Sequence, residues 1–299
     1  MRVAITGSSG LIGSALVARL RADGHEVTRL VRDRRRADEP GAVHWDPARG
    51  EVDAAGLEGH DVVIHLAGES LVGLWTKGMK ARIRESRVRG TRLIAEALAG
   101  LARPPGVLLS ASAIGFYGAR PPEEALDEEA SAGTGFLAET AQAWEAAAEP
   151  ARVAGIRVVH PRFGLVLSPR GGALAAMLPV FRLGLGGRLG SGEQVWSWIA
   201  LDDVVEAALH VIRAEALAGP VNFVAPEPVS NAEFTRVLAR VLRRPAPFAV
   251  PAFAARLAAG EMAEEMLLAG ARVVPRRLLE TGYRFRFPAL EPALRHLLG

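Results

Sequence analysis

The sequence predicts an α/β fold: a doubly wound parallel sheet with helices on both faces, followed by a smaller, mostly helical unit. Short apolar runs alternate with helical runs through the first half of the chain, which is the pattern of parallel β-α-β units. A glycine-rich turn, Gly7–Gly13, joins the first apolar run to the first helical one. The composition, 49% hydrophobic and 23% charged, is typical of a globular protein with a large core.

The alternating runs predict the elements of the first half in order. The strand candidates are short and apolar; they are Val3–Thr6, Glu26–Val31, Val43–Trp45, Val62–Leu66, Val107–Ser110 and Arg157–His160. The helical candidates are longer; they are Leu11–Ala22, Met79–Leu101 and Phe136–Val153. Residues 111–134 contain two prolines and an acidic run, and we predict that they form a loop over a site.

The pattern changes in the second half. The segment Gly184–Gly192 holds too many glycines for a regular helix. A short strand, Trp196–Ala200, is predicted to lead into a helix with Asp202 or Asp203 as its N-cap. Another strand is predicted at Val221–Val224.

From Asn231 onward the chain is mostly helical and is interrupted by prolines. We therefore predict two closely joined units. The larger comprises residues 1–165, with residues 195–225 returning to it. The smaller comprises residues 166–194 and 226–299.

The composition also excludes several classes of protein. Without cysteine there are no disulfides, catalytic thiols or cysteine-ligated metals, and the seven histidines lack the spacing of metal ligands. No run approaches the roughly 18 apolar residues that span a membrane, and the amino terminus lacks a signal-peptide pattern. We expect a cytoplasmic protein that does not partner a membrane.

The isoelectric point near 9.9 does not indicate nucleic-acid binding. It arises because nearly every basic residue is arginine, whose pKa is high. The net charge is only +3 and the basic residues are scattered along the chain. We therefore expect no nucleic-acid partner.

The turn between the first strand and the first helix has the spacing of a dinucleotide-binding motif. Gly7 permits the tight turn, Gly10 lets the backbone approach a pyrophosphate, and Gly13 lets the helix pack on the sheet. The backbone N–H groups of Ser9, Gly10, Leu11 and Ile12 then face the diphosphate at the positive end of the helix. This position after a buried strand predicts a Rossmann-type cofactor site, whereas a ligand-free turn is the simpler alternative.

The end of the second strand distinguishes the two nicotinamide cofactors. An acidic residue there would hold the ribose 2′-hydroxyl of NAD, but the strand ends at Arg32, followed by Asp33 and three more arginines. A guanidinium favours the 2′-phosphate of NADP through a charge-assisted contact. We predict NADP(H) over NAD(H), with Asp33 keeping the alternative open.

Further cofactor contacts are predicted where later strands end. Leu66, Ala67 and Gly68 follow the fourth strand, and these small or apolar residues let the cofactor lie against backbone. An ordinary strand end is the alternative. Pro161, after the strand that ends at His160, completes the set of predicted cofactor contacts.

These pieces together resemble the extended short-chain dehydrogenase/reductases, the superfamily of the sugar-nucleotide epimerases and dehydratases. More narrowly, the chain is similar to the atypical subgroup described as epimerase family proteins. The residues that carry the resemblance are spread over the chain; they include Thr6–Gly13, Leu66–Glu69, Ser86-Arg87, Ser110–Gly118, Trp144-Glu145, Arg162–Leu167, Gly190–Gly192, Gln194, Ser197–Ile199, Asp203, Asn222, Ala225-Pro226 and Gly282-Tyr283.

The resemblance implies a catalytic serine, and Ser112 is its match. It also implies a tyrosine that transfers a proton and a lysine one helical turn later that lowers the tyrosine pKa. Those places fall near Phe136 and Thr140. The only tyrosines are Tyr117 and Tyr283 and the only lysines are Lys77 and Lys80, so the chain contains no Tyr-x-x-x-Lys.

Other residues are candidates for the missing acid and base. Tyr117 lies on the loop of Ser112, although without a lysine neighbour its pKa should stay near ~10. Arg162 is a candidate for electrostatic help, with a salt bridge or a substrate-phosphate clamp as the favoured alternatives. The remaining candidates for the substrate side of the cleft are charged; they are Glu69, Lys80, Glu139 and Glu145, the last with a structural ion pair as its alternative.

The glycine-rich segment and the residues after it are predicted to lie at the substrate end. Gln194 offers an amide, and Trp196 offers a flat surface on which a sugar or base can stack. The alternative is that Trp196 and Trp198, which flank Ser197, share one strand face and belong to the core.

Two hypotheses of function follow. The first is an NADP(H)-binding, epimerase-like oxidoreductase that acts on a small polar or nucleotide-linked carbonyl or hydroxyl compound through an altered acid–base set. The second is a non-catalytic NADPH-binding protein whose loading regulates a partner. Resemblance to the superfamily also implies a possible homodimer through the helices Met79–Leu101 and Phe136–Val153.

Overall fold

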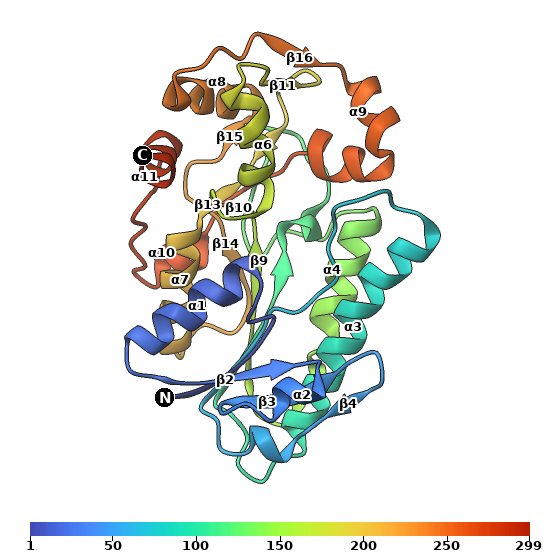
Figure 1. Cartoon of the computed structure of the whole chain (residues 1–299), viewed down its shortest axis with the longest axis vertical. Coiled ribbons are helices and arrows are strands. Elements are labelled where there is room, and N and C mark those ends of the chain that lie inside the picture. The colour runs from blue at the N-terminus through green and yellow to red at the C-terminus, as the bar shows by residue number, and fades with distance from the viewer.

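A mostly parallel sheet forms the centre of the computed structural model, which describes residues 1–299 (Figure 1). Its strand order is β14-β9-β6-β5-β1-β2-β3-β4, with β7 beside β9. The nine strands are β1 (Arg2–Thr6), β2 (Glu26–Val31), β3 (Ala42–Asp46), β4 (Glu51–Val52), β5 (Val62–His65), β6 (Val107–Ser110), β7 (Ser112–Ala113), β9 (Arg157–Phe163) and β14 (Gly219–Phe223). Within this sheet only β3 and β4 pair antiparallel. The winding direction reverses between β1 and β5, the place where such sheets open a crevice at the carboxyl ends of their strands.

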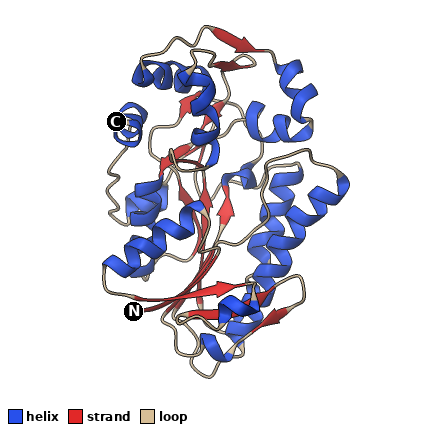
Figure 2. Cartoon of the chain, viewed as in Figure 1, coloured by secondary structure: helices blue, strands red, loops and turns tan.

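Helices cover both faces of this sheet (Figure 2). One buried cluster joins α1 (Leu11–Ala22) and α7 (Leu201–Arg213) to the sheet, and a second joins α3 (Lys77–Ala99) and α5 (Glu149–Val153) to the opposite face. The shorter elements of this unit are α2 (Arg34–Ala37), α4 (Phe136–Ala146), α10 (Arg276–Glu280) and the 3-10 turns η1 (Ala55–Leu57) and η2 (Ile114–Tyr117). No helix combines the length and the apolar character that crossing a bilayer requires.

A smaller unit lies beyond the carboxyl edge of the sheet, at the top of Figure 1. Its core joins α6 (Gly172–Arg182), α8 (Asn231–Leu242) and α11 (Leu290–Leu298). The remaining strands form four two-stranded pairs: β10 (Leu165–Leu167) with β13 (Trp198–Ala200), β11 (Gly187–Leu189) with β16 (Phe248–Val250), β12 (Val195–Trp196) with β15 (Val229–Ser230), and β8 (Ala125–Leu126) with β17 (Arg272–Val273). α9 (Ala252–Ala259) and the π-helical turn η3 (Ala263–Leu268) close the unit toward α3 and α4.

The predicted α/β architecture is confirmed, and several elements have the predicted bounds. The strands Glu26–Val31 and Val107–Ser110 and the helix Leu11–Ala22 are each formed as the sequence indicated. The boundaries that we predicted between the two units stay a prediction. In the structure, β14 pairs with β9 and α7 packs on α1, while β12 and β13 pair with strands outside the large sheet.

Three local predictions were wrong. The single helix Phe136–Val153 is two helices, α4 and α5, because Pro150 lies in the first turn of α5 and cannot continue a helix. The strand Trp196–Ala200 is divided into β12 and β13 at Ser197. The Ser197 hydroxyl donates to the Ala271 carbonyl oxygen and accepts a hydrogen bond from the Val273 N–H. The loop 111–134 contains β7, η2 and β8.

The N-cap predicted for α7 was also wrong. The helix begins at Leu201, and its N-cap residue Ala200 provides no side-chain bond. Asp203 is fully buried and accepts hydrogen bonds from the backbone N–H groups of Arg286 and Phe287 and from the Tyr283 hydroxyl. Its carboxylate therefore anchors a distant segment rather than its own helix.

Gly13 is the residue of the glycine turn with the least space around it. A Cβ there would lie 2.2 Å from the carbonyl oxygen of Gly7. We expect Gly13→Ala to lower the free energy of unfolding by about 2 kcal/mol, because α1 must move off the turn. Urea denaturation measures this change. The control is Gly100→Ala at the end of α3, where φ is −88° and the nearest atoms lie 3.7 Å from a Cβ; an equal loss in the two variants would contradict the argument.

Candidate functional site

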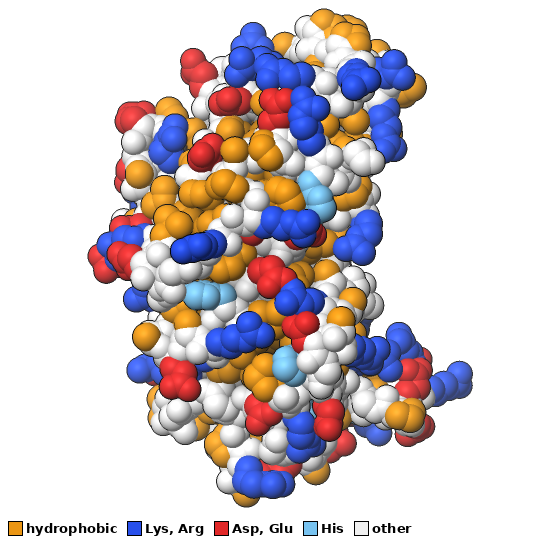
Figure 3. Space-filling model, turned by 90° about the vertical axis from the view of Figure 1, so that its left-hand side faces the viewer, with side chains coloured by type: hydrophobic (Ala, Val, Ile, Leu, Met, Phe, Trp, Pro, Cys, Tyr) orange, Lys and Arg blue, Asp and Glu red, His pale blue; other side chains and the backbone are white.

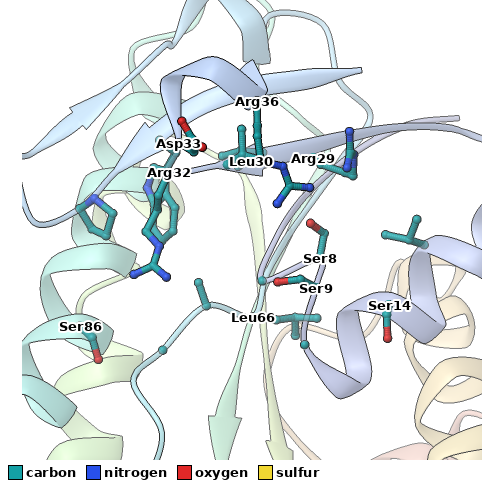
Figure 4. Close-up of a pocket in the computed structure, with 18 of the residues that line it drawn as sticks. Ser8, Ser9, Ser14, Arg29, Leu30, Arg32, Asp33, Arg36, Leu66 and Ser86 are labelled. Atoms are coloured by element: carbon teal, nitrogen blue, oxygen red, sulfur yellow. The ribbon is translucent and has the colours of Figure 1, made fainter. Parts of the chain in front are cut away.

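A cavity of about 800 Å³ opens at the carboxyl ends of β1, β2 and β5 (Figure 4). Its walls come from the glycine turn, from the segment after β2 and from the segment after β5. The predicted residues that line it are Gly7, Ser9, Gly10, Arg32, Leu66, Ala67, Gly68 and Glu69. The structure thus brings together three segments that the sequence identified separately.

Four predicted cofactor residues do not line this cavity. Leu11, Ile12 and Gly13 form the first turn of α1 behind it, and their backbone N–H groups make no hydrogen bond within the chain. These amides are the free donors that an anion can bind at a helix N-terminus. Pro161 differs, because it is buried within β9 in register with Val221, two residues before the strand ends at Phe163.

Hydrogen bonds of Thr6 and His65 connect the end of β1 to the segment after β5. The Thr6 hydroxyl accepts hydrogen bonds from the backbone N–H groups of Leu66 (3.0 Å) and Ala67 (3.2 Å), so its own proton points to Nδ1 of His65 at 2.8 Å. Burial lowers the pKa of His65 to about 4, which keeps the ring neutral. This pair fixes the segment after β5 against the end of β1.

The cavity carries more positive charge than the sequence analysis identified. Besides Arg32, the cavity is lined by Arg21, Arg29 and Arg36. Arg29 is paired with Glu39 at 2.8 Å. Figure 4 shows Arg36 extending toward Ser8 of the glycine turn, while Arg32 lies on the opposite wall.

The Asp33 side chain is hydrogen-bonded to the backbone of the next turn. Its carboxylate accepts a hydrogen bond from the Arg35 N–H at 3.0 Å and is the N-cap of α2. The short helix that it caps returns Arg36 toward the cavity. The pattern of an aspartate followed by a basic run could have shown this, because an N-cap aspartate starts a helical turn. The other lining residues that the sequence analysis missed are Ser8, Ser14, Val17, Ala18, Leu30, Val31, Trp45, Pro47, Ser70 and Ser86.

A buried polar network lies beyond β6, at the same edge of the sheet. Ser112 donates to Glu145 Oε1 at 2.7 Å, and Arg162 holds both carboxylate oxygens of Glu145, through Nε at 2.8 Å and Nη2 at 2.9 Å. The side chain of Arg162 is 3% exposed and that of Glu145 is 14% exposed. Burial alone would lower the pKa of Arg162, but the hydrogen bonds and charge of Glu145 outweigh it and raise that pKa. The salt bridge favoured for Arg162 is therefore present, and it is nearly inaccessible to water.

Tyr117, on the loop of Ser112, also belongs to this network. Its ring is fully buried, its hydroxyl donates to Asn222 Oδ1 at 2.8 Å, and it accepts from Arg162 Nη1 at 2.9 Å. Burial raises the pKa of Tyr117, against the opposing charge of Arg162, so the expectation of an ordinary pKa was wrong. With its proton committed to Asn222, this hydroxyl is a poor acid, and we no longer propose it as the proton donor.

The place of the absent tyrosine is occupied by a residue with structural contacts. Phe136 begins α4, and its ring lies under the Lys80 ammonium, 4.6 Å from the centroid. Lys80 also pairs with Glu261 of the smaller unit at 2.6 Å. Glu265 of that unit accepts hydrogen bonds from the backbone N–H groups of Phe136 (2.9 Å) and Leu137 (2.8 Å). The start of α4 thus joins the two units.

The predicted substrate-side residues of the smaller unit are engaged in packing. The amide of Gln194 donates to the backbone carbonyls of Leu189 and Leu267, both at 3.1 Å. Trp196 packs edge-on against Phe234, and Trp198 is fully buried; both belong to or border the core of the smaller unit. The core alternative for the two tryptophans therefore describes the structure. No cluster of three His, Cys, Asp or Glu residues is arranged to hold a metal ion.

The Glu145–Arg162 pair can be tested as a buried ion pair. We expect Glu145→Ala to lower the free energy of unfolding by about 3 kcal/mol, because it leaves the Arg162 charge buried and unpaired. The double variant Glu145→Ala/Arg162→Met should lose much less than the sum of its single variants, since no charge is then left alone. Chemical denaturation of the four proteins gives the coupling energy. Strict additivity would show that the two side chains do not act as a pair.

Comparison with known proteins places this geometry in a family. Residues 3–224 match the model of the NAD-dependent epimerase/dehydratase family, and residues 250–297 match a domain of unknown function, DUF1731. An epimerase family protein of Mycobacterium tuberculosis is 45% identical over 295 residues, which is 98% of this chain and 96% of that protein. The human epimerase family protein SDR39U1 is 36% identical, and the match covers 100% of both chains.

Solved structures give the same result. The crystal structure of human SDR39U1 with NADPH superposes with a TM-score of 0.90 at 34% identity, over 99% of both chains. A nucleoside-diphosphate sugar epimerase of Corynebacterium glutamicum has a TM-score of 0.82 at 40% identity, and this chain covers 58% of it. A UDP-glucose 4-epimerase of Thermotoga maritima, at 18% identity and a TM-score of 0.78, shares the fold. This chain is therefore a member of the NAD-dependent epimerase/dehydratase family, an atypical short-chain dehydrogenase/reductase similar to SDR39U1.

Proposed function

We propose that this protein is an NADP(H)-dependent oxidoreductase or epimerase, with Ser112 and Glu145 in place of the missing tyrosine and lysine. The observation that carries the cofactor preference is the distribution of charge around the cavity. Arg32, Arg36 and Asp33 all line it, but Oδ1 of Asp33, the carboxylate that could have selected NAD, accepts the Arg35 N–H as the N-cap of α2. The NADPH in the structure of human SDR39U1 supports the same preference.

The residues present fit such a cofactor. The free amides of the first turn of α1 suit a diphosphate, and the guanidinium groups suit a 2′-phosphate. When bound, the nicotinamide would supply or accept a hydride. Gly68 and Glu69 lie where the cavity continues from β5 toward α3, and Ser86 Oγ holds the Glu69 backbone N–H at 3.0 Å.

The network around Ser112 offers a route for the proton. The Ser112 hydroxyl donates to Glu145, so its lone pairs are free to accept a proton from a substrate hydroxyl. As that proton arrives at Ser112 Oγ, the Ser112 proton passes to Glu145; reduction of a carbonyl runs the same transfer in reverse. Arg162 positions the carboxylate through two hydrogen bonds. We place the substrate, a small polar or nucleotide-linked carbonyl or hydroxyl compound, against Ser112.

A second candidate function is an NADPH-binding protein without catalysis. The observation that favours it is burial, because Ser112 is 2% exposed and Tyr117 is fully buried. A substrate reaches Ser112 only if the covering segments move. The two candidates share the cofactor and differ in whether bound NADPH is ever oxidised.

The cofactor preference predicts the effect of two arginine variants. We expect Arg32→Gln and Arg36→Gln each to weaken NADPH binding about 10- to 100-fold, because each removes a charge-assisted contact. NADH binding should change little. Isothermal titration calorimetry measures both affinities. Arg34→Gln is the matched control, since Arg34 pairs with Glu51 and does not line the cavity; equal losses for NADH and NADPH would contradict the assignment.

The proposed proton route predicts the kinetics of a second pair of variants. In a screen of carbonyl compounds with bound NADPH, we expect Ser112→Ala and Glu145→Gln each to slow oxidation about 100-fold or more without weakening NADPH binding. Glu145→Asp should restore part of the rate and shift its pH profile. Oxidation that persists unchanged in both variants would reject the route, and NADPH that stays inert with every substrate would favour the second candidate.

A further inference from the structure

A second cavity lies in the smaller unit and shares no residue with the first. It has a volume of about 460 Å³ and opens between α8 and the segment that leads into β16. Pockets of this size accommodate small-molecule ligands. Neither the predicted cofactor site nor the Ser112 network extends to it.

Small residues build its floor. Ala232, Thr235 and Ala239 share one face of α8, and the two alanines leave space beside the helix. The opposite wall is β16, which pairs with β11 only because Gly187 has no side chain: a Cβ there would lie 2.0 Å from the Phe248 carbonyl oxygen. The glycine-rich segment 184–192 thus shapes this cavity.

Three arginines line the cavity, and no acidic residue does. Arg188, on β11, donates to the Ser191 carbonyl oxygen at 2.6 Å. Arg236 has one distant partner, Glu233, at 3.4 Å, and both of these side chains are exposed. Arg244 makes no ion pair or side-chain hydrogen bond. Like charges around one cavity repel each other, and an anion relieves that repulsion.

The remaining wall is apolar and flat. Phe248 is 52% exposed, and Pro245 and Pro247 lie beside it. Figure 3 shows basic, acidic and hydrophobic side chains intermixed at this end of the molecule. Guanidinium groups bind phosphates through paired hydrogen bonds, and an exposed aromatic ring stacks on a base. We propose that this cavity binds a nucleotide, with its phosphates on Arg188, Arg236 and Arg244 and its base on Phe248.

The test uses the full chain saturated with NADPH, so that the first cavity is occupied, and calorimetric titration with ADP or pyrophosphate. We expect both probes to bind, ADP more tightly. Arg236→Gln and Arg244→Gln should each weaken both probes about 10-fold, since each removes one charge-assisted contact. Phe248→Ala should weaken ADP and leave pyrophosphate unchanged. The control is Arg240→Gln, on the same helix but paired with Glu291 and outside the cavity.

Three results would overturn the proposal: no binding of either probe at millimolar concentration, binding that the two arginine variants leave unchanged, or equal affinity for ADP and pyrophosphate with no effect of Phe248→Ala. Its failure is separable from that of the proposed function. If NADPH itself does not bind, the titrations are made on the chain without NADPH; ADP affinity that falls in Arg236→Gln and Arg244→Gln but not in Arg32→Gln then assigns the binding to the second cavity.

Discussion

The ion pair between Glu145 and Arg162 is the contact on which the carboxyl edge of the sheet depends. It joins α4 to β9, and through Ser112 and Tyr117 it reaches β7 and η2. A buried ion pair recovers its desolvation cost only when its remaining donors and acceptors are also satisfied. Here the carboxylate accepts three hydrogen bonds and Arg162 lies 3.5 Å from the Phe116 ring centroid. Apolar side chains would fill this edge without that cost, and the charge retained here is what the proposed proton route through Ser112 and Glu145 requires.

The same edge holds the first cavity, because parallel strands end together. β1 and β5 are neighbours with Thr6 in register with His65, and one hydroxyl, that of Thr6, fixes the segment after β5 to the end of β1. The glycine turn and the Leu66–Gly68 segment are thus held as two sides of one opening. Residues of the predicted cofactor site that are far apart in sequence thus become adjacent where neighbouring strands end.

The sequence predicted what local patterns determine and missed what distant contacts determine. Helix α1 and strand β2 follow from their own periodicity and flanking residues, and the glycine spacing identified the cavity. The role of Asp203 was missed because its partners, at residues 283–287, are brought to it by tertiary folding. The burial of Tyr117 depends on Asn222, 105 residues away. Arg36 was missed for a local reason, since the capped turn of α2 escaped recognition.

The start of α4 explains why the chemistry we propose lies elsewhere on that helix. Where the superfamily resemblance implies a tyrosine, the Phe136 ring contacts Lys80, and the amides of Phe136 and Leu137 hold Glu265. Gly135, at φ 102°, brings the backbone close enough for this contact; a Cβ there would meet the Glu265 carboxylate at 3.0 Å. A proton-transfer group at this position would compete with the junction between the units. The opposite end of α4 is free of that constraint, and there Glu145 meets Ser112, the one residue of the expected catalytic set that this chain retains.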